Sequence, residues 1–330
     1  MDAPKTLQTA IQYFSNYDNC RAFMASVRWL DGVVRCPQCD SAKVTYLSGA
    51  RLYKCNGAHS KQKFSLKVGT VFEDSPIPLE KWLPALWLLV NDKNGISSYE
   101  IHRALGVTQK TAWFMMHRIR LAVQTKSFVK MGGDGGEVEV DETFIGGKAK
   151  NMHKSRRIKV QRARSEFTRG GALAGKTAVM GMLDREARQI RTQVIPNVRR
   201  DTLQTAILNE VQHGTKLYTD QAMGYQGLAA KYTHEVVNHM EKYVDGRVHT
   251  NGLENFWCLF KRTLNGTYVA VEPFHLFRYA DEQAFRYNNR ATKDNPLNDA
   301  DRFTLALSQI VGKRLTYKEV TGKEGETARF

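Results

Sequence analysis

The sequence predicts a multidomain protein of mixed α+β and α/β class. Three observations lead to this prediction: a cysteine cluster among short strand-like segments, a pair of helical segments with capping signals after it, and a longer stretch in which strands and helices alternate. The 330 residues allow two or three domains, and a hydrophobic content of 42% with 10% aromatic residues is sufficient for ordinary packed cores.

The charge balance points to a polyanionic partner. Lys and Arg number 49 against 33 for Asp and Glu, which leaves a net charge of +16, and such a field favours nucleic acid. A membrane surface would attract the same charge, but the longest apolar run, residues 82–90, is too short to span a bilayer, and residues 1–5 do not resemble a signal peptide. We therefore expect a cytoplasmic protein that binds double-stranded DNA and does not enter a membrane.

Residues 1–75 are expected to form N-terminal helices and a zinc ribbon. Cys36 and Cys39 are separated by two residues, and Cys55 and His59 follow with three residues between them. Zinc prefers four such ligands in a tetrahedron, and short loops on β-hairpins can supply them. Three of the five cysteines lie in this cluster, which fits a metal site in a reducing compartment better than a disulfide framework. For His59 the alternative is an ordinary surface histidine.

Residues 76–130 are expected to form a helix-turn-helix DNA-binding domain. Ser97 and Glu100 have the spacing of a capping box, and Gly106 makes a tight turn after the helix that they open. Thr108 can cap the second helix, whose N-terminus could then enter a major groove. The alternative is a generic helical hairpin with a solvated basic face.

The expected DNA contacts of this domain lie on its second helix. Gln109 and Lys110 point outward from the first turn of that helix, and Arg118 follows further along it. The basic total charge and the neighbouring zinc ribbon favour DNA reading over the solvated hairpin.

The remaining sequence divides into three segments. Residues 131–136 are rich in glycine and are expected to be a flexible linker. Residues 137–295 then contain a strand, a basic segment, a hairpin, a helix, further strands and a final helical region, and this order matches a ribonuclease-H-like mixed-sheet domain. Residues 296–330 are expected to be a C-terminal tail with a helix of unknown role.

Three carboxylates of this mixed-sheet domain are candidate ligands for magnesium. Asp141 and Asp220 are each expected at the end of a strand, and Glu254 is expected on a helix that carries Lys261 on the same stripe. A sheet of this kind gathers residues from strand ends and an adjacent helix, so that acids far apart in sequence can meet. A pair of divalent cations held by them could perform phosphoryl transfer on DNA.

Each acid also has an ordinary alternative. Asp141 could simply end a strand, and its neighbour Glu142 could be mistaken for the ligand. Asp184 is a rival at a hairpin turn, where aspartate is common for local reasons. Glu254 could be a solvent-facing helix residue. The case for a metal centre therefore depends on the combination of the acids.

A basic insertion at residues 147–170 interrupts this domain. It carries nine Lys and Arg residues, with Glu166 as its only acid. A run of this kind contacts phosphates without regard to sequence, and salt weakens the contact strongly. Arg262 would extend the basic surface to the acids, where Lys261 would hold a phosphate near the scissile bond. The residues of the insertion expected to contact DNA are Lys154, Arg156, Arg157 and Arg162.

Five motifs together resemble one known family. They are Trp-Leu-Asp-Gly before Cys-Pro-Gln-Cys (29–39), Val-Asp-Glu-Thr-Phe-Ile-Gly-Gly (140–147), Tyr-Thr-Asp (218–220), His-Thr-Asn-Gly-Leu-Glu-Asn-Phe-Trp with Lys-Arg (249–262), and Phe-Arg-Tyr-Asn-Asn-Arg (285–290). On these motifs the chain resembles bacterial insertion-sequence transposases of the DDE class that carry an N-terminal zinc ribbon. The segment around Glu254 is the most specific part of the resemblance.

The resemblance implies both an activity and a site. It implies Asp141, Asp220 and Glu254 as catalytic acids, Lys261 as an auxiliary residue, and magnesium or manganese as the working ion. It also implies binding of the terminal inverted repeats of an insertion sequence, cutting at these ends and joining of the freed 3′-hydroxyl to target DNA. Two ends must be handled together, so we expect a homodimer or a higher assembly on DNA in a bacterial nucleoid. His59 departs from a four-cysteine ribbon and stays open as a ligand.

Two rival functions remain. A non-catalytic regulator could keep the zinc ribbon and the helix-turn-helix on a decayed catalytic fold, and it would bind DNA without magnesium-dependent nicking. A structure-specific nuclease would cut branched DNA without rejoining it.

Overall fold

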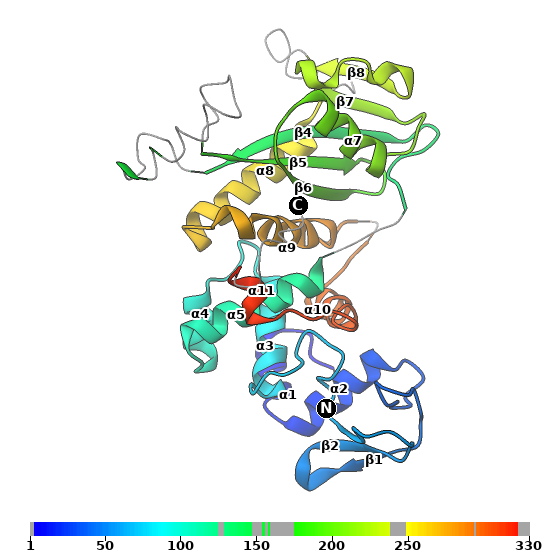
Figure 1. The fold of residues 1–330 in the computed structure, drawn as a ribbon, viewed down its shortest axis with the longest axis vertical. Helices are drawn as coiled ribbons and strands as arrows, with labels where there is room; N and C mark the ends of the chain where they lie inside the picture. The colour runs from blue at the N-terminus through cyan, green and yellow to red at the C-terminus, as the bar shows by residue number, and fades with distance from the viewer. Residues whose placement is uncertain are drawn as a thin grey trace. The chain divides into compact units, whose positions relative to one another are not determined.

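The computed structural model describes residues 3–124, 129–146, 154–155, 158, 175–237, 249–293 and 295–322. These residues belong to two units (Figure 1). The first unit combines Met1–Gln124 with Asn289–Ala328, and the second is formed mainly by Thr125–Asn288.

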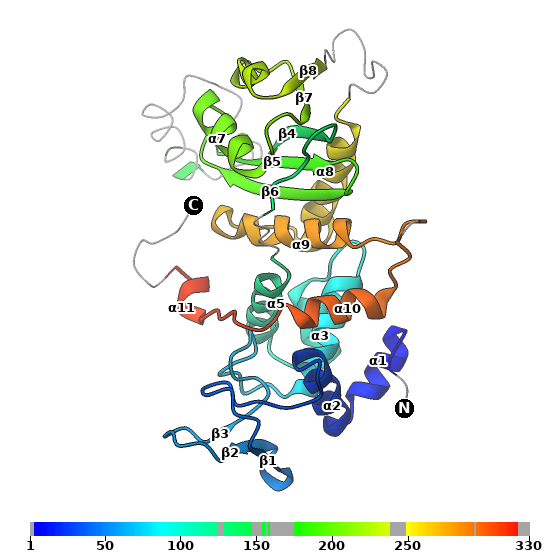
Figure 2. The ribbon, with the colours of Figure 1, turned by 90° about the vertical axis from the view of Figure 1, so that its right-hand side faces the viewer.

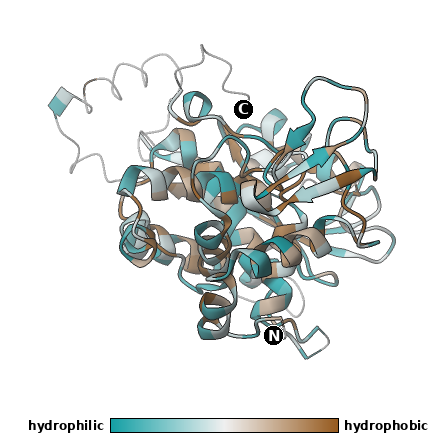
Figure 3. Cartoon of the chain, turned by 90° about the horizontal axis from the view of Figure 1, so that it is seen from below, coloured by the Kyte–Doolittle hydropathy of each residue, from teal (hydrophilic) through white to brown (hydrophobic). Residues whose placement is uncertain are grey.

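The first unit combines helices with a small antiparallel sheet of order β1-β2-β3. In chain order its elements are α1 (Leu7–Phe14), α2 (Tyr17–Arg28), β1 (Val44–Leu47), β2 (Leu52–Cys55), β3 (Lys63–Phe64), α3 (Leu79–Asn91), α4 (Ser98–Leu105), α5 (Gln109–Val123), α10 (Asp299–Ser308) and α11 (Tyr317–Val320). The ribbon expected from the cysteine spacing and the helices on either side of it are thus present, and Figure 3 shows apolar and polar residues alternating along the helices.

Local hydrogen bonds define the pair α4 and α5. The Ser97 hydroxyl accepts the Glu100 N–H at 3.2 Å, and the Glu100 carboxylate accepts the Ser97 N–H at 2.7 Å, which confirms the capping box. Gly106 ends α4 in the left-handed region with φ of 57°. Thr108 then caps α5 by accepting the N–H of Thr111 at 3.2 Å. Two capped helices joined by a tight turn are therefore confirmed, whereas their role in DNA binding stays a prediction.

Aromatic side chains from distant segments form the centre of the first unit. The ring of Phe303 on α10 lies 5.4 Å from Phe14, 5.6 Å from Phe23 and 5.1 Å from Trp87, measured between centroids. These rings come from α1, α2 and α3, so the C-terminal segment completes the core that the N-terminal segments begin. The segments that the sequence predicts as a ribbon domain, a helical domain and a tail thus belong to one unit and contribute to one core.

The second unit is built on a mixed sheet of order β6-β5-β4-β7-β8 (Figure 2). Strand β5 is antiparallel to β4 and β6, whereas β7 is parallel to β4 and β8. This is the arrangement expected of a ribonuclease-H-like domain, and it ends at Asn288, before the expected boundary at residue 295. Its elements are β4 (Glu137–Ile145), β5 (Thr177–Asp184), β6 (Gln189–Ile195), α7 (Arg200–Glu210), β7 (Lys216–Asp220), β8 (Thr233–Val237), α8 (Asn251–Thr263) and α9 (Leu276–Asn288).

Alternating residues of the sheet face two apolar cores. On one face Val138 and Val140 pack with residues of α7, among them Ile207. On the other face Val179 and Leu183 pack with residues of α8 and α9. Figures 1 and 2 show α7 on one side of the sheet and α8 on the other. The period of two along each strand thus sends neighbouring residues into different layers.

Residues 131–136 form an ordered loop of the second unit rather than the flexible linker expected from their glycines. The Gly132 N–H donates to the Asp184 carboxylate at 2.9 Å, and the Gly133 N–H donates to the Thr215 hydroxyl at 3.0 Å. Gly132 has φ of 73°, and a Cβ there would lie 2.5 Å from Thr215 side-chain atoms. The glycines therefore permit a left-handed backbone and a close approach, which is a different use of glycine from linker flexibility.

The segment after β7 is not one continuous helix. Two 3₁₀ turns, Met223–Tyr225 and Leu228–Ala230, lie there instead. Gly227 separates them with φ of 92°, a left-handed conformation that interrupts a continuous helix. Among the described residues, no helix is both long and apolar enough to cross a bilayer.

Truncation of Phe303 tests the contribution of the C-terminal segment to the first unit. Phe303 is 0% exposed, so Phe303→Ala should lower the free energy of unfolding by about 3–5 kcal/mol through lost burial and a residual cavity. Leu305→Ala in the same helix is the matched control, because Leu305 is 37% exposed. Urea unfolding followed by tryptophan fluorescence measures both variants, and equal effects would contradict the assignment of α10 to this core.

Candidate functional site

Four side chains of the ribbon form a compact cluster in the first unit. The sulfur atoms of Cys36, Cys39 and Cys55 and a ring nitrogen of His59 all lie within 4.8 Å of one another. The Cys39 and Cys55 sulfurs are 3.6 Å apart, and the Cys36 sulfur is 3.4 Å from His59 Nε2. A tetrahedron with zinc–sulfur bonds of about 2.3 Å has edges of about 3.8 Å, so the cluster has the size and the donor set of a structural zinc site.

Backbone N–H groups donate hydrogen bonds to the sulfur atoms of this cluster. Burial acts to raise the pKa of the Cys36 thiol, but the N–H groups of Gln38 and Cys39 outweigh it and bring this pKa down to about 7. The Gly57 N–H donates to the Cys55 sulfur at 3.2 Å, and a Cβ on Gly57 would lie 3.2 Å from that sulfur. The thiolate form of Cys36 is therefore favoured, and the loop at Gly57 lies close to the Cys55 sulfur.

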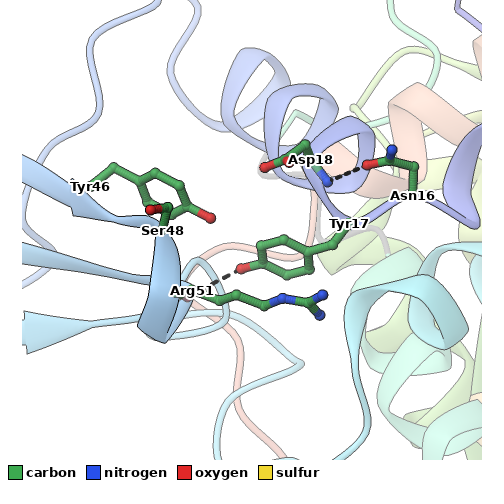
Figure 4. A pocket seen from close by; sticks show the side chains of 6 residues that line it. All are labelled: Asn16, Tyr17, Asp18, Tyr46, Ser48 and Arg51. Carbon is green, nitrogen blue, oxygen red and sulfur yellow. Dashed lines mark hydrogen bonds between the residues drawn. The ribbon is translucent and has the colours of Figure 1, made fainter.

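A polar surface hollow of about 450 Å³ lies beside the ribbon in the same unit (Figure 4). Tyr17 donates its hydroxyl to the Arg51 carbonyl at 3.2 Å, and the Arg51 guanidinium lies 4.4 Å from the centre of the Tyr17 ring. Burial, reinforced by Tyr46, raises the pKa of the Tyr17 hydroxyl to about 12. These contacts join α2 to the ribbon strands, and the hollow belongs to a different unit from the three acids.

The sequence predicts Asp141 at the end of a strand, but in the structure it lies inside strand β4. The strand continues to Ile145, but its parallel register with β7 runs only from Glu137 to Glu139. From Val140 onward the described pairing of β4 is with β5. Asp141 therefore lies two residues beyond the last residue of β4 that pairs with β7, while it is still paired with β5.

Asp220 is the last residue of β7, as expected. The last parallel pair of β4 and β7 joins Glu139 with Tyr218, so that Asp141 and Asp220 each lie two residues beyond the last pair of their strands. The side chain of Asp220 accepts the Ala222 N–H at 3.0 Å, which turns the chain away from the sheet. Two acids thus lie just beyond the paired part of two neighbouring strands.

Glu254 lies in the first turn of α8, which packs over the same face of the sheet as Asp141. Phe256 and Phe260 are buried in the core beneath the helix. The exposed stripe expected on the other side is present, with Glu254 and Lys261 both on it. Asn251 and Cys258 belong to this exposed stripe as well.

Electrostatics link the three acids. Burial raises the pKa of Asp141 to about 6, and the charges of Asp220 and Glu254 act in the same direction, although the Glu142 N–H and the Trp257 side chain lower it. In the described part of the chain, the Cys36 cluster is the one group of three or more metal-type ligands within 4.8 Å. The three carboxylates do not form such a compact cluster in the described residues.

Glu142 is a fourth acid of this region. It points to the opposite face of the sheet from Asp141, where its carboxylate accepts a hydrogen bond from the Tyr225 hydroxyl. Burial raises the pKa of Glu142 to about 7, and the charges of Asp220 and Asp141 add to this rise against the Tyr225 hydrogen bond. The residue that competes with Asp141 in sequence is thus tied to Tyr225 rather than to α8.

A buried polar network surrounds the start of α8. The Arg185 Nε donates to Glu139 at 2.8 Å, and its Nη2 donates to the His249 carbonyl at 2.6 Å. The Leu253 N–H donates to the other Glu139 oxygen at 3.0 Å. The Trp257 indole N–H donates to Asp141 at 3.0 Å. The sequence analysis gave none of these residues a role at the site, although the spacing of Glu139 from Asp141 places both on one face of a strand.

The residues expected to contact DNA have different surroundings. Lys110 is exposed, whereas the Gln109 amide donates to the Ser98 hydroxyl at 2.9 Å and so connects α5 to α4. Arg118 is 5% exposed and donates to the Leu315 carbonyl at 3.1 Å. The guanidinium of Arg118 is thus held inside the first unit, whereas the expected DNA contact would need it at the surface.

Five further basic residues are expected to contact DNA, and the structure describes two of them. Lys154 and Arg262 are exposed. Arg156, Arg157 and Arg162 lie outside the described residues, as does most of the expected basic insertion.

Comparisons with known proteins agree with this architecture. A family model described as an ISXO2-like transposase domain matches residues 134–288, and one described as a transposase zinc-ribbon domain matches residues 15–58. The chain is 26% identical over 264 residues to a Halobacterium salinarum protein described as an uncharacterized protein in transposable element ISH50, and the alignment covers 77% of this chain and 85% of that protein.

A second relative comes from Haemophilus influenzae and is described as an uncharacterized transposase-like protein. It is 30% identical over 106 residues, which are 32% of this chain and 85% of that protein. The two family models match the ribbon and the mixed-sheet unit that the structure contains, in the same order along the chain. The chain therefore belongs to the IS1595-type, ISXO2-like transposase family.

Proposed function

We propose that this protein binds the terminal inverted repeats of an insertion sequence and catalyses metal-dependent DNA strand cleavage and strand transfer. The observation that carries the proposal is the electrostatic link among Asp141, Asp220 and Glu254, because the charges of the latter two raise the pKa of the first. Acids that repel one another across two strands and a helix are typical of a site that is completed by cations.

The donor set fits magnesium or manganese. Both are hard cations that prefer carboxylate oxygens, and the three acids offer such oxygens with a net negative charge. When bound, a pair of these ions would supply an activated water or 3′-hydroxyl and would stabilise the leaving oxygen. Asp141, Asp220 and Glu254 would hold the ions, and Lys261, on the exposed stripe of α8, would bind a phosphate beside them.

The first unit supplies the features for recognition of the DNA ends. The cluster of Cys36, Cys39, Cys55 and His59 would bind structural zinc and fix the ribbon. Lys110 at the exposed N-terminus of α5 would contact DNA, together with Arg262 and the basic residues of the insertion. Gln109 would have to exchange its Ser98 partner for a base. Because two element ends react together, the working form would be a homodimer or a higher assembly on double-stranded DNA.

Conservative replacement of the acids tests the catalytic part of the proposal. Asp141→Asn, Asp220→Asn and Glu254→Gln should each lower magnesium-dependent cleavage of element-end DNA by about 10²–10³-fold, because each removes charge that holds the ions. Binding to the same DNA should be unchanged. The measurements are a nicking assay on labelled end fragments and a gel-shift titration.

Glu186→Gln is the matched control, because Glu186 is an exposed acid at the turn of the β5–β6 hairpin. It should keep cleavage and binding. If wild-type protein binds the ends but cuts none of them with magnesium or manganese, a non-catalytic regulator replaces the enzyme. Cutting without strand transfer would instead indicate a nuclease.

The raised pKa of Asp141 predicts a dependence of stability on pH. Its pKa rises from an ordinary 3.8 to about 6 in the folded protein, so ionisation destabilises the metal-free fold as the pH rises through this window. Asp141→Asn should therefore raise the free energy of unfolding by about 1–3 kcal/mol at pH 7.5 and by much less at pH 4. Urea unfolding with chelator measures the difference, with Glu186→Gln as control; a gain independent of pH would contradict the assignment.

The zinc site predicts the metal content of the purified protein. Wild-type protein should carry about one zinc ion per chain, and Cys39→Ser should lose it because three ligands hold the ion poorly. His59→Ala should lose zinc to a chelator faster than wild type, which tests the fourth ligand. Cys258→Ser, which changes an exposed thiol on α8, should keep the zinc. Elemental analysis by mass spectrometry decides, and full zinc in Cys39→Ser would overturn the site.

A further inference from the structure

We propose that Trp257 and Glu139 are positioning residues that lock helix α8 onto strand β4 and so fix Glu254 relative to Asp141. This inference rests on the proposed function, since it treats the three acids as one metal centre. It concerns residues that do not themselves carry the proposed chemistry, and it stands on hydrogen bonds and close contacts of the second unit.

The first lock joins Trp257 to Asp141. The indole N–H donates to one Asp141 carboxylate oxygen at 3.0 Å, and Trp257 is 4% exposed. An indole N–H can only donate, so this contact orients the carboxylate without competing with it for a cation. Trp257 lies three residues after Glu254, which is one helical turn. The orientation of the first acid is therefore coupled to the position of the third.

A glycine on β5 makes room for this lock. Gly181 is the cross-strand partner of Asp141, and a Cβ at Gly181 would lie only 2.6 Å from the Trp257 ring and 2.9 Å from a Leu253 methyl carbon. The bare backbone lets the indole lie directly on the strand and reach the neighbouring carboxylate. Any larger residue would push α8 away from the sheet.

The second lock joins Glu139 to the first turn of α8. Thr250 stands at the N-cap but makes no side-chain cap, so the helix lacks the usual local acceptor for its first N–H groups. The Glu139 carboxylate accepts the Leu253 N–H at 3.0 Å instead. A negative charge at this end of a helix is also favoured by the helix dipole. A Cβ on Gly252 would lie 2.9 Å from Glu139, so this approach requires glycine.

Arg185 extends the second lock to all three elements that carry the acids. Its guanidinium donates to Glu139 on β4 and to the His249 carbonyl just before α8. It also lies 4.2 Å from the ring centre of Tyr218, two residues before Asp220 on β7. The ion pair with Glu139 is buried at 2.8 Å, where such contacts are strong and geometrically specific.

The two locks have matched spacings. Glu139 and Asp141 are alternate residues on one face of β4, and they accept from Leu253 and Trp257, which are separated by one turn of α8. Glu254 lies between these two donors. A helix held at both points keeps its place along the strand, and groups that orient metal ligands in this way commonly determine affinity for the ion.

Manganese binding by the zinc-loaded full-length protein tests the first lock without relying on activity. Trp257→Phe keeps an aromatic ring but removes the donor, and it should raise the dissociation constant for Mn²⁺ by about 10–100-fold. Trp82→Phe is the matched control, because its buried indole donates to the Ser75 hydroxyl at 3.2 Å in the first unit. It should leave Mn²⁺ affinity unchanged. Electron paramagnetic resonance of free Mn²⁺ measures both.

A pair of substitutions tests the second lock. Glu139→Ala removes the acceptor and should weaken Mn²⁺ binding, whereas Glu139→Gln keeps a carbonyl oxygen for the Leu253 N–H and should recover much of the affinity. Thermal unfolding of each variant separates a loss of fold from a loss of ion binding. Equal Mn²⁺ affinities for Gln and Ala would overturn the role of Glu139.

The outcomes distinguish this inference from the function on which it rests. If wild-type protein binds Mn²⁺ and Asp141→Asn does not, while Trp257→Phe binds as tightly as Trp82→Phe, the inference is overturned and the metal centre stands. If wild-type protein shows no Mn²⁺ site that depends on Asp141, both the inference and the proposed metal centre are overturned.

Discussion

The repulsion that Asp220 and Glu254 exert on the partly buried carboxylate of Asp141 is the constraint on which the second unit depends. Asp220 and Glu254 both raise the pKa of Asp141, and burial raises it further. The three carboxylates repel one another, so other contacts of the sheet and α8 must hold them close together. The hydrophobic core under Phe256 and Phe260 packs α8 against the sheet, and the hydrogen bonds from Leu253 and Trp257 orient the helix relative to β4.

The same constraint explains where small residues occur in this unit. Gly181 and Gly252 lie where α8 meets the sheet, and each would place a Cβ within 3 Å of a neighbouring side chain. A helix set this close brings its own polar groups within reach of strand carboxylates. Glycine here serves packing between regular elements, in contrast to the turn at Gly106, where it serves a left-handed backbone.

Sequence patterns predicted what depends on local chemistry. The period of α8, the capping box at Ser97 and the ligand spacing of Cys36 and Cys39 each act within a few residues, and the structure contains all three features. Features that depend on distant partners were missed. The burial of Arg118 follows from its contact with Leu315, far along the chain, and no local pattern contains that information. The prediction of a flexible linker at residues 131–136 failed for the same reason, because the Gly132 and Gly133 N–H groups donate to Asp184 and Thr215, far along the chain.

The first unit is assembled from both ends of the chain. Its aromatic core includes Phe14, Trp87 and Phe303, so the polypeptide leaves this unit, builds the mixed sheet and then returns. A ribosome makes these parts in order, and domains tend to fold as soon as they are complete. The N-terminal segments of this unit therefore cannot complete their aromatic core until α10 has been synthesised. Chains that end before α10 would therefore lack part of this aromatic core and could not complete the ribbon-bearing unit.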